Sequence, residues 1–317
     1  MQDIVTPVPT SALARRLAAG KFVFTAEIVP PVSCEPGDLL ARASPLAGLA
    51  DAVNVTDGAG ARAHMAATAA AALLVKAGIE PVLQLTCRDR NRIALQSELM
   101  GAAALGIRNL LLLRGDDPAA GDQPGAKPVF DLTTRALAET ARIMRDEGRM
   151  PHGVPVAGRP AFFLGAADTP IDPPPGWRPE ALAAKIEAGG QFVQTQFCMD
   201  AGIVRRYVAR LGEAGLHVPV LIGVTPLRSA KSAAWMRRHL FGTIIPDDMV
   251  ARMEAAADPA AEGRRICVEL IAELATIPGV AGVHVMAPGN AAAIPEVIVQ
   301  ARAQLPRSTN TLEQIIS

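Results

Sequence analysis

With 317 residues, half of them hydrophobic, the chain is long enough for one large α/β domain or two smaller ones. Its 31 basic and 31 acidic residues balance, which argues against nucleic acid or an anionic membrane as the main partner. Four widely separated cysteines (Cys34, Cys87, Cys198 and Cys267) argue against a disulfide framework or a zinc cluster.

The first 20 residues are expected to form an N-terminal helix or arm. They lack the apolar segment of a signal peptide, and no apolar run in the sequence is long enough to span a bilayer. Residues 306–317 form a polar tail. We therefore expect a cytoplasmic protein that has no membrane partner.

Eight short apolar runs, rich in β-branched residues, predict strands along the chain. They are Phe22–Ile28, Ala52–Thr56, Pro81–Thr86, Asn109–Leu113, Ala161–Gly165, Phe192–Gln196, Val218–Val224 and Gly282–Met286. Most are apolar throughout, which is typical of parallel strands that are covered on both faces.

Segments with a period of 3.6 residues alternate with these runs and predict helices. Examples are Ala61–Gly78, Ile93–Gly106, Leu132–Glu147, Pro179–Gly189, Ala201–Gly215 and Ala260–Ile277. The alternation predicts a single-domain α/β protein over residues 1–317, folded as a closed (β/α)8 TIM barrel. A doubly wound open sheet is the alternative, but no GxGxxG motif follows the first strand to support it.

Polar residues follow or end the predicted strands, where a barrel of this kind carries its active site. Glu27 lies in the otherwise apolar first strand, where an inward-facing carboxyl group would suit a proton donor. Pairing with a nearby Lys or Arg is the structural alternative. After the third strand, Arg88 and Arg90 could hold a phosphate or form a salt-bridge cluster with Asp89.

Later strand ends suggest a large ligand. Arg114-Gly115-Asp116 combines an anion-binding side chain, a close backbone approach and a hydrogen-bond acceptor, and Gly165-Ala166-Ala167 leaves room for a flat group. Gln194 and Gln196 could orient a heterocycle, or could serve only the core. The five histidines lack metal-ligand spacing, so no metal site is expected. A large organic cofactor with a phosphate-bearing tail fits better.

Several segments resemble methylenetetrahydrofolate reductase, in that family's order over nearly the whole chain. They are FTAEIVPP, DAVNVTDGAGAR, LQLTCRDRNRIALQSELMGAAALGIRNLLLLRGDDP, KIEAGGQFVQTQF, VLIGVTP and GVAGVHVM. The resemblance implies an FAD-containing (β/α)8 barrel that reduces 5,10-methylenetetrahydrofolate to 5-methyltetrahydrofolate. It also implies that Glu27 is the general acid, and that Glu27, Asp116 and Gln196 contact the folate substrate.

FAD contacts are expected at residues matched to the family and at the strand ends described above. They are Thr56, Asp57, Ala59, Gln84, Arg114, Gly115, Asp116, Val129, Phe130, Gly165, Ala166, Ala167 and Lys185, with Lys185 near the diphosphate.

Four positions depart from the pattern of NADH-using members. Gln84 replaces a histidine, Met286 an aromatic residue and Asn290 an arginine, while Met236 lies where an aromatic would stack on NADH, with Trp235 beside it. The resemblance nevertheless implies NADH or NADPH as the electron donor. The alternative is a flavoprotein subunit that receives electrons within a larger complex, from an iron–sulfur partner. The resemblance further implies a homo-oligomer in one-carbon metabolism, serving methionine biosynthesis or methyl-group assimilation.

Overall fold

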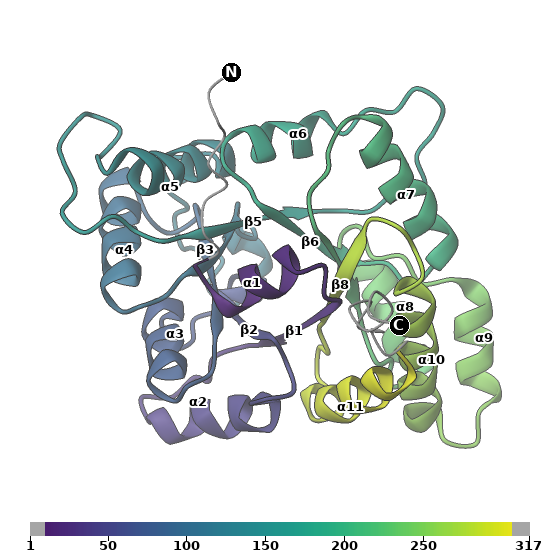
Figure 1. The fold of residues 1–317 in the computed structure, drawn as a ribbon. Coiled ribbons are helices and arrows are strands. Elements are labelled where there is room, and N and C mark those ends of the chain that lie inside the picture. Colours follow the sequence, from purple (N-terminus) through teal and green to yellow (C-terminus); the bar gives the residue numbers. More distant parts are fainter. Residues whose placement is uncertain (1–9, 306–317) are drawn as a thin grey trace, which may run out of the picture.

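Eight parallel strands close into a barrel, in which each strand pairs with the next along the chain and β8 pairs with β1 (Figure 1). The computed structural model describes residues 10–305. The strands are β1 (Val23–Ile28), β2 (Ala52–Val55), β3 (Pro81–Thr86), β4 (Asn109–Leu113), β5 (Phe163–Asp168), β6 (Phe192–Phe197), β7 (Val220–Val224) and β8 (Val280–Val285). The predicted single-domain (β/α)8 TIM barrel is therefore confirmed.

Helices surround the barrel and alternate with its strands (Figure 1). They are α1 (Ala12–Ala18), α2 (Pro36–Ala43), α3 (Ala67–Lys76), α4 (Arg92–Ala104), α5 (Thr134–Glu147), α6 (Glu180–Glu187), α7 (Ala201–Glu213), α8 (Ala230–His239), α9 (Asp247–Ala255), α10 (Pro259–Leu274) and α11 (Ile294–Gln304). Four 3₁₀ turns are η1 (Ser44–Leu46), η2 (Ala59–Ala61), η3 (Pro118–Ala120) and η4 (Ala291–Ala293). The helix or arm predicted for residues 1–20 contains α1, while its residues 1–9 and the predicted tail at 306–317 lie outside the described residues.

The predicted elements differ from the observed ones mainly at their ends. β5 runs to Asp168, beyond its predicted end at Gly165, because its pairing with β6 continues as far as Asp168 opposite Thr195. The helix expected from Ala61 begins only at Ala67. Gly60 and Ala61 have φ angles of 63° and 53°, a left-handed conformation that no α-helix accommodates.

The N-terminal end of the barrel is closed by α1, which lies across it (Figure 1). Leu13 and Leu17 of this helix pack on the innermost side chains of the barrel, among them Val23 and Phe192. The carboxylate of Glu80 accepts hydrogen bonds from the first amides of α1, at Ala12 and Leu13, both over 2.8 Å. An acidic group at a helix N-terminus satisfies free N–H groups and interacts favourably with the positive end of the helix dipole.

Side chains alternate along each strand between the barrel interior and the covering helices. On β1, Val23 belongs to the inner cluster and Ala26 to the outer one. Thr25 and Glu27 therefore face the interior, and Glu27 is the nearer of the two to the mouth, the end of the barrel at which the strands end. Within residues 10–305, no helix combines the length and hydropathy required to cross a membrane.

Candidate active site at the barrel mouth

Glu27 lies near the mouth on the interior side of β1, with about a fifth of its side chain exposed (22%). Gln84 of β3 is buried and donates a hydrogen bond from Nε2 to Oε2 of Glu27 over 2.9 Å. Gln84 is uncharged, so this contact holds the carboxyl group through a neutral hydrogen-bond donor. His284 of β8 adds a second nitrogen, with Nε2 at 3.6 Å from the same oxygen.

Below Glu27, a layer of buried polar side chains crosses the barrel. Asn54 of β2 and Gln194 of β6 exchange hydrogen bonds through their amides, over 2.8 and 3.2 Å. Gln194 also donates to Oγ1 of Thr25 over 3.0 Å, and this hydroxyl lies 2.9 Å from Nδ1 of His284. Gln194 thus belongs to an internal network, as one of its two sequence interpretations predicted.

Asp57, directly beyond β2, has both carboxylate oxygens committed inside the protein. It accepts from the amide and the hydroxyl of Thr86, over 2.8 and 2.9 Å, and from two guanidinium nitrogens of Arg90. Burial acts to raise the pKa of Asp57, but the bonds and charge of Arg90 and the bonds from Thr86 outweigh it, and the pKa lies below its usual value.

Arg88 braces the loops beyond three strands. Its guanidinium pairs with Asp89 through two contacts of 2.8 Å and donates to the carbonyl oxygens of Gly58 and Asp116, over 3.1 and 3.4 Å. Arg88 thus forms the ion pair with Asp89 that one of its two interpretations predicted, whereas Arg90 pairs with Asp57. Asp116 also accepts a hydrogen bond from the Gly60 amide at Oδ2, over 2.8 Å, which leaves Oδ1 with no bond to any residue among 10–305.

Thr56 gives this chain's own indication of a ligand. The residue is 2% exposed, and its Oγ1 is buried without a hydrogen-bond partner among residues 10–305. A buried hydroxyl without a partner is costly, and a bound molecule is one way to satisfy it. Thr56 was matched to a flavin contact in the sequence, so the site fits such a cofactor at this position.

The side chains of Arg114 and Phe130 are in contact. The Arg114 guanidinium carbon lies 4.4 Å from the centre of the Phe130 ring, within cation–π distance. The segment carrying Val129 and Phe130 is joined to the loop after β3 by backbone bonds to Arg88 and Cys87. These expected cofactor contacts, distant in sequence, therefore lie close together in the fold.

The expected contacts on β5 have different surroundings. Lys185 of α6 donates from Nζ to the carbonyl oxygen of Ala167 over 2.7 Å, so it reaches the C-terminal end of β5. A Cβ on Gly165 would lie 2.5 Å from the Phe192 ring, and this ring fills the space that the glycine leaves. Ala166 packs in the outer core against the helices, so its methyl group faces away from the barrel interior.

Gln196 lies at an irregularity of the barrel. The register between β6 and β7 shifts between Gln194 and Phe197, and a bulge of this kind can redirect a side chain at a functional site. Oε1 of Gln196 accepts from the Phe197 amide over 2.9 Å. Its Nε2 donates to no residue in the described part of the chain, so this donor is available to a ligand.

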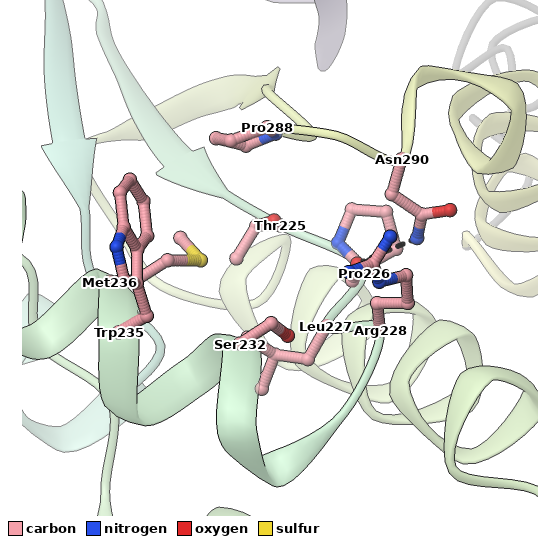
Figure 2. A pocket seen from close by; sticks show the side chains of 9 residues that line it. All are labelled: Thr225, Pro226, Leu227, Arg228, Ser232, Trp235, Met236, Pro288 and Asn290. Carbon is pink, nitrogen blue, oxygen red and sulfur yellow. Dashed lines mark hydrogen bonds between the residues drawn. The ribbon is translucent and has the colours of Figure 1, made fainter.

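A small cavity of about 40 Å³ opens between the loops that follow β7 and β8. Figure 2 shows the side chains that line it: Thr225, Pro226, Leu227, Arg228, Ser232, Trp235, Met236, Pro288 and Asn290. Asn290 donates from Nδ2 to the Pro226 carbonyl over 3.2 Å. Two of the sequence departures, Met236 and Asn290, therefore line one cavity.

A larger cavity of about 270 Å³ lies between the loops that follow β2, β3 and β4. Arg62, His64, Arg88 and Arg90 all contribute to its wall. His64 accepts at Nε2 from the Gly58 amide over 2.9 Å. Of the three arginines in the cavity wall, Arg88 and Arg90 are in ion pairs, and Arg62 has no acidic partner among the residues that the structure describes.

The mouth thus gathers most of the expected site residues, but not as one bonded cluster. Across residues 10–305, no hydrogen bond or ion pair joins Glu27, Asp116 and Gln196 to one another. Thr25 and His284 were missed as site residues. The sequence held a signal for each. Thr25 lies two residues before Glu27 and so on the same face of its strand, and His284 is a polar residue in an apolar strand.

Comparison with known proteins identifies relatives of this barrel. The family model described as methylenetetrahydrofolate reductase matches residues 12–302. Methylenetetrahydrofolate reductase 2 of Saccharomyces cerevisiae is 28% identical over 220 residues, which cover 68% of this chain and 35% of that protein. A 5,10-methylenetetrahydrofolate reductase of Pectobacterium carotovorum is 28% identical over 156 residues, 49% of this chain and 47% of that protein.

The matched regions are only part of these relatives, about a third of the yeast protein and about half of the bacterial one. Among solved structures, an uncharacterized protein from Clostridium thermocellum superposes with a TM-score of 0.61 at 14% identity, covering 92% of this chain and 98% of that one. It is described as binding two copies of 5-methyl-5,6,7,8-tetrahydrofolic acid. At this identity the likeness shows a common fold.

Proposed function

Because the chain belongs to the methylenetetrahydrofolate reductase family, we propose that it reduces 5,10-methylenetetrahydrofolate to 5-methyltetrahydrofolate with FAD as cofactor. The observation that carries this proposal is Glu27, a partly exposed carboxyl group inside the barrel mouth, held by the neutral side chain of Gln84. The folate compound bound by the Clostridium thermocellum protein of the same fold supports the substrate class.

Glu27 is the proposed general acid. Its carboxyl group protonates a nitrogen of the five-membered ring of the substrate, the ring C–N bond breaks, and the methylene carbon becomes an iminium that accepts a hydride. The Glu27 carboxylate left behind keeps its hydrogen bond from Gln84 and regains a proton from solvent, which reaches it because the side chain is 22% exposed.

The cofactor would be held on the side of the mouth formed by β2, β4 and β5. When bound, the flavin supplies the hydride that the substrate accepts. The free hydroxyl of Thr56 offers a hydrogen bond, and Lys185 retains donors for a phosphate beyond its bond to Ala167. Further proposed contacts are Asp57, Ala59, Gln84, Arg114, Gly115, Asp116, Val129, Phe130 and Ala167, with Gly165 and Ala166 contributing backbone atoms only.

Asp116 and Gln196 are the proposed orienting contacts of the substrate. Each retains an unused polar atom, Oδ1 of Asp116 as acceptor and Nε2 of Gln196 as donor. Together they can recognise a pterin edge, which carries both donors and acceptors.

A reduced nicotinamide is the proposed electron donor. Relatives from Caenorhabditis elegans and Oryza sativa are named for NADPH and NADH, respectively. An electron-transfer partner is the alternative, and the comparison of donors is anaerobic rapid mixing with NADH, NADPH and reduced ferredoxin. Fast bleaching of the flavin absorbance by a nicotinamide alone would exclude an obligate partner protein.

The experiment that tests the function separates its two half-reactions. Purified protein should bind FAD, and its reduced flavin should be reoxidised by methylenetetrahydrofolate under anaerobic conditions. Glu27→Gln should abolish that reoxidation and leave flavin reduction intact, whereas Glu139→Gln on the exposed face of α5 should change neither. Protein that takes up no FAD, or folate turnover that survives Glu27→Gln, would overturn the proposal.

A further inference from the structure

The two oxygens of Glu27 have different surroundings. Gln84 donates to Oε2 over 2.9 Å, and Nε2 of His284 lies 3.6 Å from that same oxygen. No hydrogen bond reaches Oε1 from any residue among 10–305. The carboxyl group is therefore held at one oxygen and free at the other.

His284 presents either an N–H or a lone pair to Oε2 of Glu27, depending on which ring nitrogen carries the proton. The contact with Thr25 favours one of these two tautomers. The Thr25 hydroxyl can donate either to Nδ1 of His284, at 2.9 Å, or to the Val283 carbonyl, at 3.4 Å. The shorter contact has the geometry of a good hydrogen bond, and the longer one is beyond the usual range. With Nδ1 accepting, the neutral ring carries its proton on Nε2, which is the nitrogen nearest Glu27.

The amide pair beneath leaves the proton of the Thr25 hydroxyl unused. Gln194 donates from Nε2 both to Asn54 and to Thr25, over 3.2 and 3.0 Å, while its Oε1 accepts from Asn54. Thr25 is thus an acceptor from Gln194, and its own proton is free for His284. All four residues of this network are at most 2% exposed, so water does not compete for these bonds.

We infer that the buried series Asn54, Gln194, Thr25 and His284 presents an N–H to Oε2 of Glu27, so that Glu27 carries and releases its proton at Oε1. The inference rests on the proposed function for the role of Glu27. Thr25 and His284 are positioning residues, because they act through the carboxyl group of Glu27.

The arrangement has a direct chemical consequence. When the proton leaves Oε1 for the substrate nitrogen, the negative charge that remains on the carboxylate meets the Gln84 amide, which is hydrogen-bonded to Oε2, and the Nε2–H of His284 at 3.6 Å, which is beyond hydrogen-bond distance but attracts that charge. Hydrogen bonds to a charged group are stronger than those to a neutral one, so the donors favour the state after transfer. The opposite tautomer of His284 would place a lone pair beside that charge.

Two substitutions at His284 distinguish the nitrogens. The amide nitrogen of Gln can occupy the place of Nε2, whereas that of Asn can occupy only the place of Nδ1. His284→Asn should slow reoxidation of reduced flavin by methylenetetrahydrofolate about tenfold or more, and His284→Gln should retain most of the rate. Flavin reduction and the dissociation constant of 5-methyltetrahydrofolate should change by less than about twofold in both. Equal rates for the two variants, or a slower Gln variant, would overturn the inference.

Nitrogen NMR tests the tautomer without reference to catalysis. In ¹⁵N-histidine-labelled protein, the His284 signals are assigned by their loss in His284→Gln, and should show a protonated Nε2 and a bare Nδ1. Thr25→Ser should keep this pattern, and Thr25→Val should disturb it. Protonated Nδ1 in the wild-type protein would overturn the inference even if the chain is a reductase. The expected pattern without folate turnover would instead contradict the proposed function.

Folding and labelling need a matched control. His217→Asn changes an exposed histidine that has no bond to other residues in the described range. It should leave the thermal midpoint, both half-reactions and the His284 signals unchanged. If His284→Asn lowers the thermal midpoint below those of the wild type and of His217→Asn, its rate is compared with that of His284→Gln, whose side chain is closer in volume to histidine.

Discussion

Asp57 and Arg90 are joined by two hydrogen bonds, from Nη1 to Oδ2 over 2.8 Å and from Nη2 to Oδ1 over 3.0 Å. The side chains are 7% and 19% exposed, so the pair is largely removed from water. It ties the end of β2 to the loop beyond β3, and both residues line the larger cavity at the mouth. The pair therefore holds the shape of the site from inside the protein.

Replacing Arg90 by Met should lower the free energy of unfolding by about 2–3 kcal/mol, because the Asp57 carboxylate is left buried without its partner. Chemical denaturation at neutral pH measures the loss. The matched control is Arg92→Met, which removes a guanidinium that pairs with Asp131 on the surface and should have little effect. Equal losses for the two variants would show that burial of the Asp57 pair is unimportant.

The same pair should make stability depend on acid. The pKa of Asp57 is lowered in the folded protein, so its contribution is present above the unfolded pKa of about 3.9 and is lost as pH falls through the folded value. Arg90→Met removes the main cause of the lowering. Between neutral pH and pH 3, the difference in stability between wild type and variant should therefore shrink; a constant difference would contradict this.

Thr56→Val should have opposite effects on the empty and the FAD-bound protein. Without cofactor it should leave stability unchanged or raise it, because Oγ1 has no partner among residues 10–305. With FAD it should weaken binding by about 2–10-fold, the loss of one hydrogen bond. Flavin fluorescence titration and thermal melts of both forms measure the two effects. Destabilisation of the cofactor-free protein would indicate that the hydroxyl serves the fold.

Gly165→Ala should destabilise the barrel, because the added Cβ would lie 2.5 Å from the Phe192 ring. Overpacking of this kind costs about 1–3 kcal/mol. Gly212→Ala provides the control, since it adds a Cβ in α7 with nothing within 4 Å and should stabilise by about 0.4–1 kcal/mol. Urea unfolding of both variants should give shifts of opposite sign.

The four thiols should differ sharply in reactivity. Cys34 is exposed, whereas Cys87, Cys198 and Cys267 are buried. Burial raises the pKa of Cys87 to about 11 and that of Cys198 to about 12, and it raises the pKa of Cys267 as well. At neutral pH, a thiol reagent should modify Cys34 rapidly in the native protein and the other three only after unfolding. Labelling of Cys87 at a similar rate would indicate that the barrel mouth opens.

Much of the fold follows from local patterns. Continuous apolar runs such as Asn109–Leu113 predicted buried parallel strands because both faces of such strands are covered, and all eight are present. The start of α3 was predicted too early because helical periodicity does not register the left-handed backbone of Gly60 and Ala61. A positive φ at an alanine depends on the surrounding loops, which a local pattern does not contain.

The candidate residues at the strand ends could be named from the sequence, whereas most of their contacts could not. Glu27 was found from its charge in an apolar strand, since a carboxyl group there needs a special reason. Gly165 appeared to leave room for a ligand, but the Phe192 ring occupies that room, and the two residues meet only through the pairing of β5 with β6. Arg88 and Arg90 had two open interpretations until their partners were visible.

By itself, the sequence determined the barrel class and the family, and it singled out Glu27 as the candidate acid, because each depends on residue type and order along the chain. Tertiary structure decided the partners: which cations are neutralised, which amide holds Glu27, and which histidine faces it. Those contacts join residues as far apart as Thr25 and His284, which become neighbours only when β8 pairs with β1 and closes the barrel. Hydrogen bonding acts over about 3 Å, so only the closed barrel brings these atoms within reach.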